Sequence, residues 1–145
     1  EDNPTAIDEG QLSRWSQNDA IEWWGHREDM PTVLGVAALV VLPSYREGLP
    51  KVLLEAAACG KALIATDVPG CREIVQHQKT GLLVPARDPI ALADAIASLL
   101  TNHELRTAMG DSGREFVVRE HSKEKIGRHF LNLYQERLGL AEARQ

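Results

Sequence analysis

The stretch Leu42–Gly60 reads LPSYREGLPKVLLEAAACG, and the order of its residues predicts a strand end, a tight loop and a helix. The run Leu39–Leu42 is short and continuously apolar, as in strands that are buried on both faces of a parallel sheet. Pro50 begins the predicted helix Pro50–Cys59, and Gly60 follows its end. These signals predict an α/β fold, with the loop at the carboxyl end of a strand, where open α/β sheets bind ligands.

Other apolar runs and helix signals extend this pattern along the chain. Further strands are predicted at Ile21–Trp24, Ala62–Thr66 and Gly81–Val84. Helices are predicted at Glu28–Ala38, after the N-cap Asp88 with Pro89 as first residue, at Glu104–Glu120 and at Ser122–Leu138. The alternation indicates a Rossmann-like parallel sheet sandwiched by helices. Because four strands are few for this class, we expect a sheet that is truncated at its N-terminal edge.

Two apolar details add expectations about packing. Trp23 and Trp24 are adjacent, so in a strand they would point to opposite faces, one of them into the core. The last helix places one apolar face along its length, made by Ile126, Phe130, Leu133, Tyr134 and Leu138. We expect one domain over residues 1–138 and a frayed tail over residues 139–145.

Composition excludes several classes of protein. The chain has 145 residues, of which 43% are hydrophobic and 26% charged, as in soluble globular domains. A net charge of −5 argues against nucleic-acid binding. Cys59 and Cys71 are too few for a disulfide framework or a zinc site, so they are expected to be reduced thiols in a cytoplasmic protein. No metal and no cofactor are expected.

The start of the Pro50–Cys59 helix is the candidate anion site. Its free amides would come from Gly48, Leu49, Lys51 and Val52, and a helix N-terminus suits a diphosphate. Two carboxylates, Glu47 before the helix and Glu55 one turn inside, would flank that diphosphate. On periodicity alone, both are equally well explained as exposed surface residues.

The segment PSYREGLPKVLLEAAACGKALIATDVPGCREIV, continued by KTGLLVPARDPIALADAI, resembles the signature of the retaining family-four glycosyltransferases with the GT-B fold. The resemblance extends from about Trp23 to Leu138. It implies the C-terminal, nucleotide-sugar-binding half of such an enzyme. The donor would be a nucleoside diphosphate sugar, with a UDP-sugar favoured. The acceptor would be a glycan or a polyprenyl-linked glycan in lipopolysaccharide, capsule or exopolysaccharide synthesis.

The resemblance also implies roles for single residues. Glu47 would be the catalytic residue, orienting the donor sugar through its hydroxyls, and Glu55 would bind the ribose diol. Other donor contacts would come from Gly25, His26 and Arg27 near the base, Ser44 at the phosphate end, and Gly48, Leu49 and Lys51 along the sugar and diphosphate. A structural role for His26 and a solvated position for Lys51 remain open.

One part of the family pattern is missing. Family members carry a Gly-Arg and a later Lys that neutralise the diphosphate, whereas Glu1–Ile21 holds Arg14 as its only basic residue. We expect the chain to lack the N-terminal acceptor domain, through which the full-length enzyme would reach its acceptor and the inner face of the membrane. Alone, it would be inactive. Alternatives are another GT-B enzyme, such as a nucleotide-sugar epimerase or a phosphorylase, and a non-catalytic nucleotide-binding module.

Overall fold

The computed structural model describes residues 7–17 and 20–138 and divides the chain into two compact units, the first ending at Met30. In the first unit, α1 (Glu9–Ser16) begins after Asp8, whose Oδ1 accepts a hydrogen bond from the backbone N of Gln11 at 3.0 Å. This is a standard N-cap. The predicted tail over residues 139–145 lies outside the described residues.

The second unit contains a parallel sheet of three strands. These are β1 (Leu39–Leu42), β2 (Ala62–Thr66) and β3 (Gly81–Val84), in the spatial order β1-β2-β3. Leu42 lies opposite Ala65, and Thr66 opposite Val84, so the three carboxyl ends meet at one edge. All of β2 is buried, whereas β1 is half-buried along its length, as expected for a strand at the side of the sheet.

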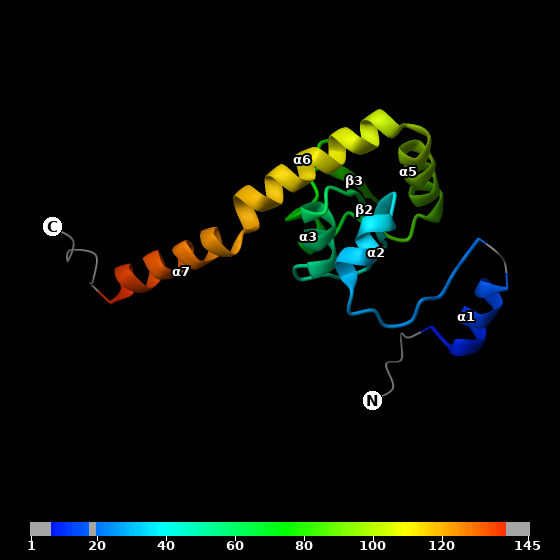
Figure 1. Cartoon of the computed structure of the whole chain (residues 1–145), viewed down its shortest axis with the longest axis horizontal. Helices are drawn as coiled ribbons and strands as arrows, with labels where there is room; N and C mark the ends of the chain where they lie inside the picture. Colours follow the sequence, from blue (N-terminus) through cyan, green and yellow to red (C-terminus); the bar gives the residue numbers. More distant parts are fainter. Residues whose placement is uncertain (1–6, 18–19, 139–145) are drawn as a thin grey trace. The chain divides into compact units, whose positions relative to one another are not determined.

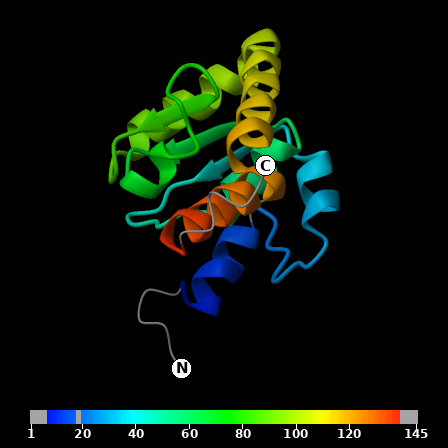
Figure 2. The same ribbon diagram turned by 90° about the vertical axis from the view of Figure 1, so that its left-hand side faces the viewer.

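Helices flank this sheet and confirm the predicted α/β class. The helices after α1 are α2 (Met30–Val36), α3 (Lys51–Ala58), α4 (Pro69–Arg72), α5 (Pro89–Thr101), α6 (His103–His121) and α7 (Lys123–Arg137), of which α7 contacts α6 and leads away from the sheet (Figure 1). In Figures 1 and 2, α5 lies next to β2 and β3, and α6 runs beside the sheet in contact with both α3 and α5. On one face of the sheet, Ile64 and Val84 pack with Leu99 of α5 and Met109 of α6.

The helix ends follow the local signals in the sequence closely. Asp88 caps α5 by accepting from the backbone N of Ala91 at 2.9 Å, and Ser122 caps α7. Gly60 adopts φ +69° just after α3, as predicted for a residue that ends a helix. Pro50 is the N-cap of α3 rather than its first helical residue, which shifts the predicted start by one position.

The predicted strand Ile21–Trp24 is wrong, because residues 21–25 form neither a strand nor a helix. Trp23 and Trp24 are 63% and 48% exposed, so the expected core packing of one of them is also wrong. A strand needs a neighbouring backbone that pairs with its amides and carbonyls. This segment belongs to the first unit, where none of the described strands pairs with it.

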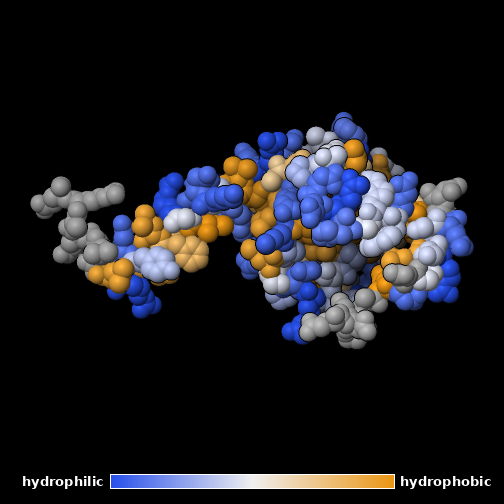
Figure 3. Space-filling model, turned by 60° about the horizontal axis from the view of Figure 1, so that its bottom comes forward, coloured by the Kyte–Doolittle hydropathy of each residue, from blue (hydrophilic) through white to orange (hydrophobic). Residues whose placement is uncertain are grey.

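The apolar face predicted for the last helix is present but is not buried. Its side chains are 40–66% exposed on α7, which has no buried residue. Figure 3 shows hydrophobic atoms at the surface in this part of the molecule. The 3.6-residue period of the apolar residues therefore predicted the helix correctly but did not predict whether its apolar face is buried.

Candidate functional site

The loop 43–50 joins the carboxyl end of β1 to α3 and is held by the corner that follows β2. The hydroxyl of Thr66, the last residue of β2, donates a hydrogen bond to the carbonyl oxygen of Ser44. Gly70 of α4 packs directly on the loop: a Cβ there would meet the carbonyl oxygen of Gly48 and would lie 2.5 Å from that of Glu47. The loop is thus supported from the β2–α4 corner.

The start of α3 is open for a ligand. Its N-cap is Pro50, with φ −70° and ψ 108°, and no side chain caps it. The amides of Lys51 and Val52 therefore have no acceptor within the helix, and they lie at its positive end. Leu53 and Leu54 donate to the carbonyl oxygen of Pro50 at 3.1 and 3.4 Å. Lys51 is exposed at this end, so its ammonium adds to the positive potential there.

Glu47 and Glu55 differ in their surroundings. Glu47 is half-buried in the loop, whereas Glu55 is exposed on α3. Burial raises the pKa of the Cys71 thiol, and the negative charge of Glu47 raises it further, while a hydrogen bond with Thr66 lowers it. The negative charge of Glu47 is thus felt by the thiol of Cys71, which belongs to α4. Glu47 precedes α3 in the chain and Glu55 lies one turn inside it, and the flanking of a diphosphate by their carboxylates stays a prediction.

The other three predicted donor contacts, Gly25, His26 and Arg27, belong to the first unit and are exposed. The guanidinium of Arg27 donates to Asp29, Nε to Oδ1 at 2.7 Å and Nη2 to Oδ2 at 2.6 Å. This pair raises the pKa of Arg27 and lowers that of Asp29. Arg27 also lies 5.8 Å from the ring centroid of Trp24. The structure brings these residues together locally, within their own unit.

The segment after β2 forms the short helix α4, which ends at Arg72. Arg72 Nε donates to Asp67 Oδ1 at 2.5 Å, and this bond lowers the pKa of Asp67. Among the described residues, no three His, Cys, Asp or Glu side chains are placed to hold a metal ion.

Sequence reasoning missed the two supports of the loop, Thr66 and Gly70, and the buried Cys71 that senses the charge of Glu47. The signal that could have found them is the segment Asp67–Cys71, in which Pro-Gly comes two residues after a buried strand that is parallel to β1. Parallel neighbours place their carboxyl-end loops side by side, so a glycine there fits a close backbone approach.

Within the described ranges, no helix combines the length and apolar character needed to cross a membrane.

Comparison with known proteins gives a consistent set of relatives. A family model described as "Glycosyl transferases group 1" matches residues 2–102. N-acetyl-alpha-D-glucosaminyl L-malate synthase of Bacillus anthracis is 35% identical over 116 residues, which cover 80% of this chain and 30% of that protein. Sucrose-phosphate synthase of Thermosynechococcus elongatus superimposes with a TM-score of 0.83 at 32% identity, covering 92% of this chain and 34% of that one.

A third match is a solved complex. Anabaena HepE bound to UDP gives a TM-score of 0.81 at 21% identity, over 88% of this chain and 35% of that one. At that identity, the likeness concerns the fold alone. The chain spans about a third of the length of these three relatives.

Proposed function

The chain belongs to the Glycosyl transferases group 1 family, and from this we propose that it binds the donor of a retaining glycosyltransferase with the GT-B fold. The donor is a nucleoside diphosphate sugar, and residues 1–138 supply its binding domain. The observation that carries the proposal is the loop 43–50, which presents Glu47 and the uncapped start of α3 at the carboxyl edge of the sheet.

Each part of this edge suits one part of the donor. The free amides and positive end of α3 suit the diphosphate, whose negative charge grows as it leaves the sugar. Glu55, one turn further along α3, accepts hydrogen bonds from the ribose diol. Glu47 accepts them from hydroxyls of the sugar and holds it in place for transfer. Positioning of this kind is worth several kcal/mol in catalysis, and no metal is needed for it.

UDP is the nucleotide that we favour. HepE, which shares the fold, has been solved with UDP and with UDP-glucose, and the Bacillus anthracis relative is named for an N-acetylglucosaminyl product. For the intact protein, we propose transfer to a glycan or lipid-linked acceptor in lipopolysaccharide, capsule or exopolysaccharide synthesis, in the cytoplasm at the inner face of the membrane. Gly25, His26 and Arg27 are proposed to approach the base.

A nuclear magnetic resonance titration of the chain tests the donor site. UDP, UDP-glucose, GDP-mannose and ADP-glucose are added separately, and we expect amide shifts over residues 44–55, largest with UDP-glucose. Glu55→Ala should weaken the binding of UDP by about 10- to 100-fold, since a hydrogen bond to a charged group is worth ~1.5–3 kcal/mol. Glu136→Ala, which removes an exposed carboxylate from α7, is the matched control and should leave the dissociation constant unchanged.

Glu47 is tested by a difference between two ligands. In Glu47→Gln, UDP should bind as before, while UDP-glucose should lose the extra affinity that its sugar provides. In the intact enzyme the same substitution should lower kcat more than it raises KM. Absence of shifts over residues 44–55 with all four nucleotides would refute the donor site. If Glu47→Gln keeps the preference for UDP-glucose over UDP, Glu47 does not contact the sugar.

A further inference from the structure

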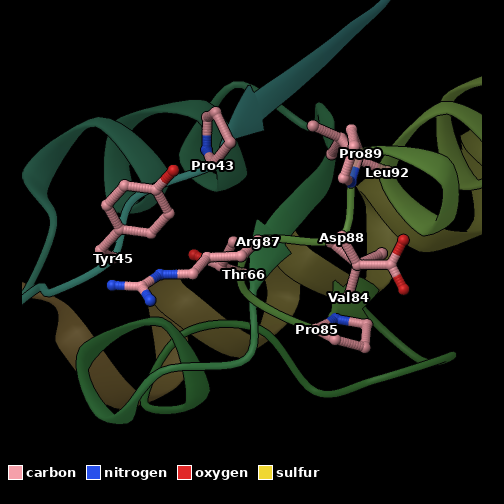
Figure 4. A pocket seen from close by; sticks show the side chains of 9 residues that line it. All are labelled: Pro43, Tyr45, Thr66, Val84, Pro85, Arg87, Asp88, Pro89 and Leu92. Carbon is pink, nitrogen blue, oxygen red and sulfur yellow. The ribbon is translucent and has the colours of Figure 1, made fainter.

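A hollow opens at the same edge of the sheet, on the side of β2 and β3. It has a volume of about 400 Å³ and receives residues from the ends of all three strands. It is lined by Pro43, Tyr45, Thr66, Val84, Pro85, Arg87, Asp88, Pro89 and Leu92 (Figure 4). We call it the Arg87 pocket. None of the donor contacts described above lies in its wall.

Arg87 is held in an unusual backbone conformation. Its φ is +64°, in the left-handed region that non-glycine residues rarely adopt, and such outliers gather at functional sites. Its guanidinium carbon lies 5.4 Å from the ring centroid of Tyr45. Figure 4 shows the side chain reaching across the pocket toward that ring. Arg87 and Tyr45 are both exposed, so the charge lies at the open wall of the hollow, beside the ring.

The guanidinium keeps its hydrogen-bond donors for a ligand. No described carboxylate forms an ion pair with Arg87. The neighbouring Asp88 is already used, because its Oδ1 caps α5 by accepting from the backbone N of Ala91 at 2.9 Å. In Figure 4 the Asp88 carboxylate points away from the guanidinium. An aromatic wall with one free, planar cation suits a ligand that carries an acidic group.

We propose that the Arg87 pocket binds a phosphate or carboxylate group of the sugar acceptor. Thr66 is the link to the donor site: it lines the pocket, and its hydroxyl holds Ser44 in the loop that carries Glu47. A ligand in the pocket therefore lies against Pro43 and Tyr45 of the loop that also carries Glu47. The proposal rests on the proposed function, because only a donor sugar at Glu47 makes its neighbour an acceptor.

The preference of the pocket for an acidic group is tested with three sugars that have the same pyranose ring and differ in the group at carbon 6. Glucose 6-phosphate, glucuronic acid and glucose are titrated into the chain at constant ionic strength, with amide shifts as the readout. We expect shifts over residues 43–45 and 84–88 and at least tenfold tighter binding of one acidic sugar than of glucose. Tighter binding of glucose 6-phosphate identifies a phosphate group, and tighter binding of glucuronic acid a carboxylate. Equal, weak binding of all three would overturn the proposal.

Arg87→Gly is the decisive variant, because glycine adopts the same φ without strain and removes the charge. It should fold with an undiminished melting temperature and lose the tenfold preference for the acidic sugar. Gln78→Gly is the matched control, since Gln78 has a φ of +63° and is not among the residues that line the pocket. Its preference should be that of the parent chain. An Arg87→Gly variant that keeps the preference would overturn the proposal.

UDP added to the same samples separates this inference from the proposed function. Shifts over residues 44–55 with UDP, together with no preference for acidic sugars, would leave the donor site standing and refute the acceptor pocket. A preference for acidic sugars without any response to UDP would show an anion-binding pocket and refute its role as an acceptor site. Both responses together are the expected result.

Discussion

Gly70→Ala is the substitution that most directly tests how the candidate loop is supported. The new Cβ would lie 2.5 Å from the carbonyl oxygen of Glu47 and 2.7 Å from its carbonyl carbon, whereas real Cβ atoms keep at least 3.0 Å. The carbonyl oxygen of Gly48 would be nearer still, and all three neighbours are backbone atoms, so the loop or α4 must move by more than the 0.5 Å between 2.5 and 3.0 Å. Overpacking of this kind costs ~1–3 kcal/mol.

Urea unfolding measures that cost, and the donor titration measures its effect on the loop. We expect Gly70→Ala to lower the free energy of unfolding by about 1–3 kcal/mol at an unchanged slope with urea. UDP-glucose should bind more weakly, since Glu47 moves with its carbonyl. In the intact enzyme, a displacement approaching ~1 Å can lower the rate about 100-fold.

Gly127→Ala is the control for adding a methyl group to a glycine. A Cβ at this position of α7 would have no atom within 4 Å, and alanine favours a helix by up to ~1 kcal/mol over glycine. This variant should be at least as stable as the parent chain and should bind UDP-glucose equally well. If Gly70→Ala behaved in the same way, the close approach of α4 to the loop would be refuted.

Three further predictions concern charge, reactivity and packing. Hydrogen bonds from Lys125 first and then from Arg119 lower the pKa of Glu120 to about 2. The contribution of Glu120 to stability is therefore present above its ordinary pKa of about 4.5 and is lost as the pH falls toward 2. The carboxyl resonance of Glu120 in a pH titration checks this, and Lys125→Ala should raise its midpoint. Cys71 should resist iodoacetamide in the folded chain, because burial raises its pKa, whereas the exposed Cys59 reacts; equal rates by mass spectrometry would contradict this. Leu53→Ala, at a fully buried position, should cost ~2–5 kcal/mol in urea unfolding.

Local signals were sufficient for the elements that the sequence predicts well. A helix N-cap depends on one side chain and an amide three residues later, as for Asp88 and Ala91, so it can be recognised without knowing the fold. The same holds for the left-handed Gly60 after α3. The parallel strands β2 and β3 were predicted at their observed bounds, because continuous apolar runs are typical of strands with both faces covered.

Features that depend on distant partners could not be predicted in this way. The run Ile21–Trp24 has the composition of a strand, but composition does not supply a neighbour to pair with. Likewise, the apolar period of α7 shows which side chains share a face and not what covers them. In the site, Glu47 was predicted from a family resemblance, whereas its support by Gly70 depends on how two loops meet in space. Arg87 was missed because its φ cannot be read from the sequence.

The supports of the loop agree with the donor contact that we propose for Glu47. Surface loops are usually mobile, and ordering them on binding reduces affinity. Here the loop 43–50 is fixed at Ser44 by Thr66 and at Glu47 and Gly48 by Gly70 before any ligand arrives. One support is the last residue of β2 and the other lies in the corner after it, and β2 is buried throughout. Glu47 thus takes its position from the core of the sheet, so core substitutions that shift β2 should affect the proposed sugar contact more than the proposed ribose contact at Glu55, which α3 carries by itself.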